Sequence, residues 1–256
     1  MAGVKAAEAQ AGPVPRNSRA TEAKIPPASS KLGLRDLFGA ARPRARAPPF
    51  VDLFEDYDEY HSHVETGNLL RAQLIAPWID EGSSVLDAGC GDGRVAEFLR
   101  SVRKVSIRGI EGSVVAAQKA RGRGLDVIVQ DLDTNPRLPG PVDYVLFVEV
   151  LEHLRSPHRV LKAATAIARK GVIVTLPNSG WFADRVQMAM GFVPRQSFTH
   201  LHAWSQRDFL AFCAQLGLFI RAEKFLASET TWRANLVAAF PNLLARQLAF
   251  LIAPLR

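Results

Sequence analysis

Apolar and polar residues alternate in two ways along the chain from about residue 68 onward. Short apolar runs of strand length are separated by segments whose apolar residues recur at helical spacing. We expect strands at residues 84–88, 104–110, 125–130, 142–148, 171–176, 218–227 and 246–253. The run 142–148 is too apolar for a strand with one exposed face and suits a parallel sheet covered on both faces. The pattern therefore predicts an α/β fold with a doubly wound sheet.

Helix boundaries are marked by residues that favour helix ends. Ser156 is followed by Pro157, which predicts an N-cap with proline at the first helical position. Ser205 and Asp208 form a capping-box pattern at the start of another helix. Gly217 is expected to end that helix.

The positive charge of the chain lies mainly in its first fifty residues. The net charge is +7, and residues 1–50 hold nine Lys or Arg against three acidic residues, which leaves +1 for the remainder. Residues 1–49 are rich in Ala, Pro and Arg, so we expect a disordered basic tail, with an organelle transit peptide as the alternative. Residues 50–256 are expected to form one domain, and its near-neutral charge argues against a nucleic-acid ligand.

No apolar run is long enough to predict a membrane span. The apolar segment 243–255 could be read as a helix on a membrane surface, but its place after six expected strands and its termination at Pro254 favour the last strand. Cys90 and Cys213 are the only cysteines and lie in no Cys or His cluster, so we expect neither a metal site nor a disulfide. This cysteine usage fits a reducing compartment, and we expect a cytoplasmic protein.

The segment 85–94, Val-Leu-Asp-Ala-Gly-Cys-Gly-Asp-Gly-Arg, joins a strand to a helix through three glycines. Gly89, Gly91 and Gly93 allow a tight turn and a close approach of the backbone to a ligand. The following helix start offers free N–H groups. Such a loop at the carboxyl end of a strand predicts a ligand site, and Asp87 is expected to hold the loop rather than bind the ligand.

Two further carboxylates follow the next two strands. Glu111 ends the second strand, 22 residues after Gly89, where a carboxylate can bind the two hydroxyls of a ribose. The alternative is that Glu111 is an exposed charge that stabilises the following helix. Asp131 follows the third strand, and Asp133 is a weaker candidate. Three successive strands that each end near an acid indicate a particular ligand site more specifically than one glycine loop does.

This set of features resembles the class I S-adenosylmethionine (SAM) methyltransferases. The segment 149–154, Glu-Val-Leu-Glu-His-Leu, resembles small-molecule members of that superfamily, and the resemblance covers about residues 68–253. The chain is nearest to the MetW-like branch in Thr175-Leu176-Pro177-Asn178, Arg185, Gly191, residues 200–205 and Arg207-Asp208-Phe209. The resemblance implies a Rossmann-like, seven-stranded, mostly parallel sheet whose last strand is antiparallel.

The resemblance also implies SAM as the cofactor. Glu111 would bind the ribose, and Asp131 would accept a hydrogen bond from the adenine amino group. The residues assigned to the cofactor-binding site are Asp87, which would support the loop, and Gly89, Cys90, Gly91, Gly93, Glu111, Gly112, Asp131, Leu132 and Glu149.

A methyl acceptor with a hydroxyl group would need a base to remove its proton. The candidates for this role are Glu149, Glu152, His153, His200 and His202. Our first choice is His153, with a purely structural histidine as the alternative. His202, beside Trp204, could instead line the acceptor pocket.

Two segments are expected to enclose the substrates. Residues 177–204 form a long connection with a short helical stretch at 181–190, and this connection should shape the acceptor pocket. Residues 50–80 should form N-terminal helices and a lid. The acidic and aromatic segment Phe50 to His63 resembles such a lid, with Tyr57 and Tyr60 as contacts, although a helix packed passively on the domain is equally compatible.

The sequence thus predicts a SAM-dependent methyltransferase that acts on a small molecule, with oxygen as the expected acceptor and nitrogen or carbon as open alternatives. The second hypothesis is a protein of the same fold that regulates another enzyme, as in the MetW-like role in methionine biosynthesis. A protein partner or a homodimer would fit either hypothesis. A nucleic-acid methyltransferase is disfavoured because residues 149–152 do not form an Asn/Asp-Pro-Pro-Tyr motif.

Overall fold

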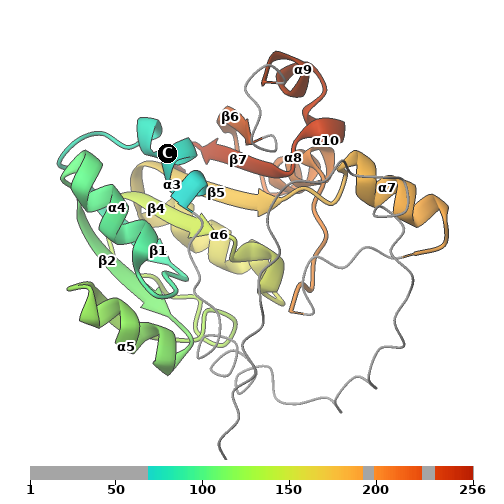
Figure 1. Ribbon diagram of the computed structural model, residues 1–256. Coiled ribbons are helices and arrows are strands. Elements are labelled where there is room, and N and C mark those ends of the chain that lie inside the picture. Colours follow the sequence, from blue (N-terminus) through green and yellow to red (C-terminus); the bar gives the residue numbers. More distant parts are fainter. Residues whose placement is uncertain (1–68, 193–198, 227–233, 256) are drawn as a thin grey trace, which may run out of the picture. The chain divides into compact units, whose positions relative to one another are not determined.

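The computed structural model describes residues 69–192, 199–226 and 234–255 (Figure 1). The expected tail at 1–49 and the expected lid at 50–63, with Tyr57 and Tyr60, lie outside these residues. Those expectations therefore stay predictions.

Seven strands form one sheet, as the sequence predicts. The strands are β1 Ser84–Ala88, β2 Ser106–Glu111, β3 Asp126–Val129, β4 Val142–Val148, β5 Ala168–Pro177, β6 Ile220–Leu226 and β7 Gln247–Ile252. Their order is β3-β2-β1-β4-β5-β7-β6. The first five strands run parallel, and β7 pairs antiparallel with both β5 and β6. The predicted doubly wound sheet and its antiparallel last strand are confirmed.

Several strand boundaries differ from the prediction, and two of these differences have local reasons. The strand expected at 104–110 begins at Ser106 because Lys104 adopts a left-handed conformation, with φ of 52°, where the preceding helix ends. The strand expected at 171–176 begins at Ala168, directly after a helix. Ala168 pairs with Val142 across an irregularity in the β4–β5 register, so the strand extends beyond its most apolar part.

Helices cover both faces of the sheet (Figure 1). The α-helices are α3 Leu69–Ile75, α4 Arg94–Arg103, α5 Val114–Gly122, α6 Pro157–Ile167, α7 Phe182–Ala189, α8 Gln206–Gln215, α9 Ala234–Ala239 and α10 Pro241–Leu244, with 3-10 turns η1 Ala76–Trp78 and η2 Leu151–His153. Buried residues of α3, α4 and α5 share one core with side chains of β1 and β2. Buried residues of α6 and α8 share a second core on the other face.

The predicted capping box is present at the start of α8. The hydroxyl of Ser205 accepts a hydrogen bond from the N–H of Asp208, and the Asp208 carboxylate accepts one from the N–H of Ser205. Gly217 follows the helix with φ of 70°, a conformation that glycine adopts readily. The helix signals around this segment are confirmed.

Ser156 is the N-cap residue of α6 and Pro157 is its first residue, as predicted. The Ser156 side chain, however, makes no capping hydrogen bond. The carboxylate of Asp133 instead accepts hydrogen bonds from the N–H groups of Arg155, at 2.8 and 3.0 Å, and of Ser156, at 3.2 Å. An acid 23 residues away therefore supports this turn, which local sequence could not indicate.

The C-terminal apolar segment enters the sheet. β7 lies between β5 and β6, and Phe250 and Ile252 are fully buried, so the alternative of a membrane-surface helix is wrong. Within the described part of the chain, no helix has the length and apolar character that crossing a bilayer requires.

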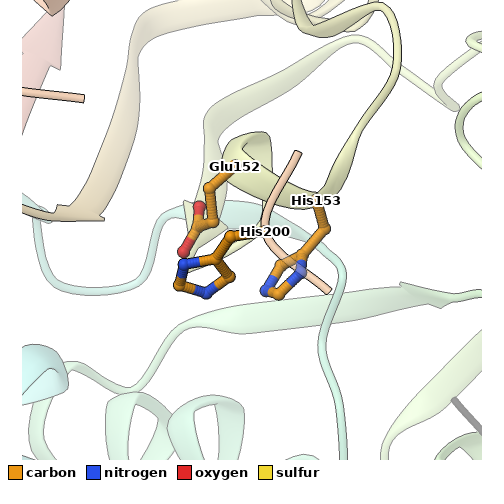
Figure 2. A group of neighbouring side chains, drawn as sticks. All are labelled: Glu152, His153 and His200. Carbon is orange, nitrogen blue, oxygen red and sulfur yellow. The ribbon is translucent and has the colours of Figure 1, made fainter. Parts of the chain in front are cut away.

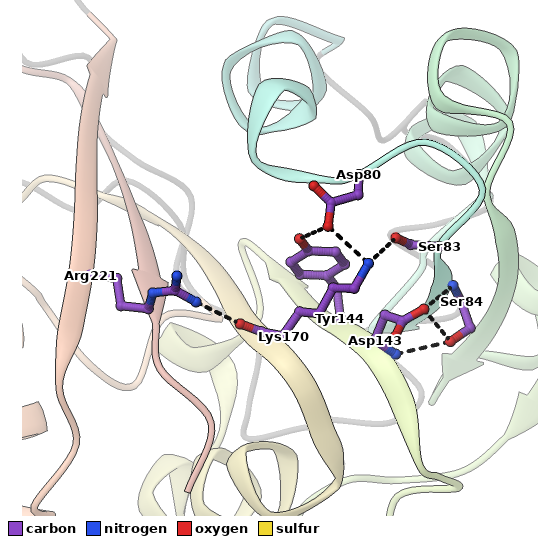
Figure 3. Close-up of polar contacts among 7 residues, drawn as sticks. All are labelled: Asp80, Ser83, Ser84, Asp143, Tyr144, Lys170 and Arg221. Carbon is purple, nitrogen blue, oxygen red and sulfur yellow. Dashed lines mark hydrogen bonds and ion pairs between the residues drawn. The ribbon is translucent and has the colours of Figure 1, made fainter. Parts of the chain in front are cut away.

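A polar network joins the amino-terminal ends of β1 and β4 to β5 (Figure 3). The ammonium group of Lys170 lies 2.9 Å from the Asp80 carboxylate, which also accepts a hydrogen bond from the Tyr144 hydroxyl. The Asp143 carboxylate accepts hydrogen bonds from the backbone N–H and the hydroxyl of Ser84. These contacts satisfy polar groups at the strand ends opposite the glycine loop and fix the alignment of the strands.

Candidate functional site

The glycine loop between β1 and α4 has the conformation that its sequence predicts. Gly89, Gly91 and Gly93 have φ values of 88°, 53° and 83°, which other residues rarely adopt. The N–H of Gly89 donates to the carbonyl of Ile110, so the loop is held against β2. A Cβ atom at Gly89 would lie 2.4 Å from Val150 Cγ2, so the turn also needs glycine for packing.

Cys90 is a small buried residue in this loop, as expected. A Cβ atom at Gly109 would lie only 2.5 Å from Cys90 Sγ, so the thiol occupies the space that this glycine of β2 leaves. Burial raises the pKa of the thiol far above its usual range. The side chain packs against the sheet, so Cys90 would reach a ligand through its backbone.

Glu111 connects the loop to the end of β2. One carboxylate oxygen accepts the N–H of Gly91 at 2.8 Å, and the other accepts the N–H of Ser113 at 2.9 Å. The residue is only 7% exposed, so the alternative of an exposed surface charge is wrong. Each carboxylate oxygen has a further lone pair, and the group can still accept hydrogen bonds from two hydroxyls.

Asp87 is buried below the loop without a hydrogen-bond partner. It is 1% exposed, and among the described residues no donor reaches either of its carboxylate oxygens. Burial, together with the charge of Glu111, raises the pKa of Asp87 to about 7. Asp87 therefore does not hold the loop by hydrogen bonds from its side chain, contrary to expectation. A buried polar group without a hydrogen-bond partner is uncommon, and a polar ligand bound here could supply that partner.

The two candidate acids after β3 have different partners. Asp131 is half-buried, and its Oδ1 accepts the N–H of Asp133 at 2.8 Å. The Asp133 carboxylate is engaged at the turn before α6, as described above. Leu132, between them, is buried in the core, and Gly112 lies between Glu111 and the start of α5. Asp131 thus keeps a carboxylate oxygen for a ligand, whereas Asp133 supports the fold.

The fourth strand ends in a strained, charged residue. Glu149 has φ of 58°, which is rare for a residue other than glycine and is often found at functional sites. Its carboxylate pairs with Arg71 at 3.0 Å and accepts a hydrogen bond from the Thr175 hydroxyl at 3.3 Å. Burial raises the pKa of Glu149, and the charge of Arg71 opposes that shift. Sequence reasoning missed Arg71, since no local signal links residues 78 positions apart.

Glu152, His153 and His200 form a cluster after β4 (Figure 2). Each offers one oxygen or nitrogen atom, and these atoms all lie within 4.8 Å of one another. The rings of His153 and His200 are 4.7 Å apart and nearly perpendicular. Of the five candidates for acceptor chemistry, the structure brings these three together.

The electrostatic surroundings of the cluster favour uncharged side chains. Glu152 is fully buried, and burial together with the charge of Glu149 raises its pKa well above the ordinary value. Burial lowers the pKa of His200, and the charge of Arg71 lowers it further. At neutral pH the His200 imidazole is therefore neutral and can donate an electron pair.

His202 lies next to this cluster and faces Trp204. The two rings are 5.4 Å apart, and in the described part of the chain neither His202 Nε2 nor Trp204 Nε1 has a hydrogen-bond partner. The backbone N–H of His202 donates to the carbonyl of Glu152 at 3.0 Å, which ties the segment to η2. These two unpaired ring nitrogens suit the lining of a polar pocket.

From the sequence, a metal site was expected only if the cysteines formed a cluster. Glu152 and His200 were separate candidates for a base, and their meeting with His153 was not predicted. The spacing Glu149-x-x-Glu152-His153 was a signal, but the second histidine comes from a connection 47 residues later. Only the folded chain brings that connection to the end of β4.

Comparison with known proteins agrees with this geometry. A family model described as "Methionine biosynthesis protein MetW" matches residues 71–252. A ubiquinone biosynthesis O-methyltransferase of Bordetella bronchiseptica is 34% identical over 109 residues, which cover 37% of this chain. The match spans 44% of that relative, which is less than half of its length.

Solved methyltransferases share the fold. A SAM-dependent methyltransferase of Thermotoga maritima, described as a possible histamine N-methyltransferase, is 20% identical with a TM-score of 0.56, and the match covers 79% of this chain and 95% of that one. Magnesium protoporphyrin IX methyltransferase of Synechocystis PCC 6803, solved with bound SAH, is 15% identical with a TM-score of 0.53, over 78% and 99% of the two chains. The chain therefore has the Rossmann-like methyltransferase fold and, because the family model spans most of its length, it belongs to the MetW family.

Proposed function

We propose that this chain is a SAM-dependent methyltransferase that methylates an oxygen atom of a small molecule. One observation carries the proposal. Asp87 and Glu111 lie in the last residues of β1 and β2, and Asp131 lies two residues after β3, so three carboxylates stand at the carboxyl ends of three adjacent parallel strands, on the side where the glycine loop turns. Ligands of open α/β sheets bind at this edge.

The residues of this edge fit the parts of SAM. The free lone pairs of Glu111 would accept hydrogen bonds from the ribose hydroxyls. Asp131 would accept one from the adenine amino group. Asp87 has no hydrogen-bond partner among the described residues, and a cofactor that carries cationic groups would favour its charged form. SAM is the cofactor that this combination of acids and glycines suits.

When bound, SAM supplies a methyl group activated by a sulfonium. The protein has to orient the acceptor and remove its proton. In this proposal the acceptor meets the end of β4, where His153 lies. The proton of the acceptor hydroxyl would pass to the imidazole of His153, whose Nδ1 lies 3.2 Å from the carbonyl of Thr199, a contact that orients the ring.

An oxygen acceptor is supported by the similarity to the Bordetella relative, a ubiquinone biosynthesis O-methyltransferase. His202 and Trp204 would contribute polar ring nitrogens to the acceptor pocket. Because a neutral imidazole at the end of β4 is suited to proton removal, an acceptor that must lose a proton fits this place better than one that is already nucleophilic.

The second candidate is a regulatory protein of methionine biosynthesis. The match of the MetW family model to residues 71–252 favours it. A regulator of this kind would bind another protein and could retain the cofactor as an effector. Methyl transfer from labelled SAM to a small molecule separates the two candidates, since a pure regulator would produce no labelled product.

The central experiment is calorimetric titration of the full chain with SAM and with S-adenosylhomocysteine. We expect binding of both at micromolar levels. Gly91→Val should abolish binding, because Gly91 has a left-handed backbone and lies in the loop that the ligand approaches. Gly122→Val is the matched control, since open space surrounds Gly122. A folded wild-type protein that binds neither compound would refute the proposal. The acceptor is then identified by mass spectrometry of extracts incubated with labelled SAM.

A further inference from the structure

We propose that Glu152, His153 and His200 bind a divalent metal ion. Two imidazoles and one carboxylate are donors that Zn²⁺ and Mn²⁺ accept, and three protein ligands leave at least one coordination position open. Among the described residues, this is the group of His, Cys, Asp and Glu side chains whose donor atoms converge closely enough to share an ion.

The burial of Glu152 is the strongest indication of a missing partner. The residue has no exposed surface, and neither carboxylate oxygen has a hydrogen-bond partner among the described residues. A buried carboxylate without a partner is strongly unfavourable. The nearby Glu149 already has partners in Arg71 and Thr175. Glu152 is therefore the acid to which a cation would bind.

The backbone holds the three donors together. Glu152 and His153 belong to the short turn η2, and His200 comes from the connection before α8. The carbonyl of Glu152 accepts the N–H groups of Leu201 and His202 at 2.8 and 3.0 Å, so the two segments are directly joined. The donors therefore come from two elements whose spacing is fixed by the fold.

One imidazole has the support that metal ligands commonly have. His153 Nδ1 lies 3.2 Å from the carbonyl of Thr199. If Nδ1 carries the proton and donates to that carbonyl, Nε2 has the electron pair that binds a metal. A hydrogen bond of this type fixes the orientation of a ligating histidine.

The local charge suits a cation. Arg71 pairs with Glu149, so in the described part of the chain the second acid, Glu152, has no cation beside it to offset its charge, and a metal ion bound there would supply that positive charge. Ligand atoms around one ion at about 2.1 Å are roughly 3–4 Å apart. Since the donor atoms here lie within 4.8 Å of one another, small side-chain rotations bring them to a common ion.

The ion would have a role in the proposed methyl transfer, and this role rests on the proposed function. A hydroxyl oxygen bound to the ion loses its proton to solvent more readily. The oxygen then forms a bond to the methyl carbon, and the electrons of the broken carbon–sulfur bond stay on sulfur. His153 would in that case act as a ligand instead of the proton acceptor.

The test measures metal binding without SAM, so that its failure is separate from a failure of the proposed function. Tag-free full chain is treated with chelator and titrated with Mn²⁺, followed by electron paramagnetic resonance, and with Zn²⁺, followed by calorimetry. We expect one equivalent to bind with a dissociation constant in the micromolar range or below, and the melting temperature to rise with the ion. Glu152→Gln and His200→Gln should each weaken binding at least tenfold.

Two features keep this test decisive. Glu152→Gln removes a buried unpaired carboxylate, so we expect the metal-free variant to melt at the same temperature as the wild type or higher, and its lost binding cannot come from unfolding. His158→Gln, at an exposed histidine of α6, is the matched control and should bind like the wild type. Millimolar or absent binding by the wild type, or unchanged binding by folded Glu152→Gln, would overturn the proposal.

Discussion

The carboxylate of Glu111, at the end of β2, accepts a hydrogen bond from the backbone N–H of Gly91, with 2.8 Å between Glu111 Oε2 and the Gly91 nitrogen. Its other oxygen accepts the N–H of Ser113. The acid that is expected to bind the ribose thus also fixes the conformation of the glycine loop. The shape of the loop and the affinity of the site are therefore linked through one side chain.

Glu111→Ala should weaken SAM binding and lower stability together. The change leaves two backbone N–H groups without their acceptor and removes the acceptor for the ribose. We expect a loss of about 1–3 kcal/mol in binding free energy, the range for an unpaired buried polar group. Calorimetry gives the dissociation constant, and thermal unfolding gives the stability. Glu81→Ala, at an exposed acid that pairs with Lys104, should change neither. An unchanged dissociation constant in the Glu111 variant would remove its role in the site.

Gly89→Ala tests whether the loop needs glycine for packing. The new Cβ would lie 2.4 Å from Val150 Cγ2 at a positive φ. Strain and overpacking together should lower the free energy of unfolding by about 2–5 kcal/mol. Gly82→Ala has a similar φ but open space around it, so its loss should be only about 1–2 kcal/mol.

A double variant isolates the contact at Gly89. Val150→Ala removes the methyl groups that Gly89→Ala would meet, so the two changes combined should destabilise the chain by less than the sum of the single variants. Urea unfolding of all four proteins measures this coupling. If the losses in free energy of unfolding are strictly additive, then backbone strain at φ of 88°, and not the contact with Val150, causes the loss in Gly89→Ala.

The sequence predicted those parts of the fold that depend on local patterns. The seven strands followed from apolar runs, and the loop at Gly89, Gly91 and Gly93 followed from glycine spacing, because backbone conformation and strand burial act within a few residues. Glu111 was found because it lies at the end of a strand.

The contacts that sequence could not predict join distant positions. Arg71 of α3 pairs with Glu149 at the end of β4. Before α6, the Asp133 carboxylate accepts a hydrogen bond from the N–H of Ser156, where a capping bond to the Ser156 hydroxyl was expected. The lack of a hydrogen-bond partner for Asp87 among the described residues could not be predicted either, because it depends on which distant residues pack around the end of β1. Such contacts are decided by the arrangement of elements in space, which periodicity does not specify.

Asp131→Ala and Asp133→Ala should affect different properties. Asp131 keeps a carboxylate oxygen for a ligand, so its loss should weaken SAM binding by about tenfold, as expected for one hydrogen bond to a charged group. Asp133 accepts N–H groups at the start of α6, so its loss should lower stability by about 1 kcal/mol, as for a missing helix cap, with SAM affinity retained. The reverse assignment would show that Asp133 is the adenine ligand.

His153→Ala should lower turnover by about 10²–10⁴, the usual range for a general base, while SAM affinity stays the same. Turnover, binding and melting temperature are measured on the same variant, with His158→Ala as the control at an exposed position.

Chelation of the wild type distinguishes the two roles of His153. If His153 is a metal ligand, chelation should reproduce the loss. If it is the base, chelation should leave turnover unchanged. A stable variant with normal turnover would exclude both roles and make His202 the next candidate.

Asp87 should give the stability of the chain a distinct pH dependence. Its pKa is about 7 in the folded chain against an ordinary value of 3.8. Between these values the folded chain holds a proton that the unfolded chain has released. The free energy of unfolding should therefore fall as pH rises from about 4 to about 7 and then level off. At about 1.4 kcal/mol for each unit of pKa difference, the upper limit of this fall is about 4 kcal/mol.

Asp87→Asn removes the ionisable group and should remove this part of the pH dependence. Urea unfolding of wild type and variant at several pH values gives the difference in their stabilities, in which the other titrating groups cancel. This difference should grow in favour of the variant between pH 4 and pH 7. Asp126→Asn, at an exposed acid that pairs with Arg108, should show no such trend. A difference between Asp87→Asn and wild type that stays constant with pH would mean that Asp87 ionises in the folded chain as readily as in the unfolded one.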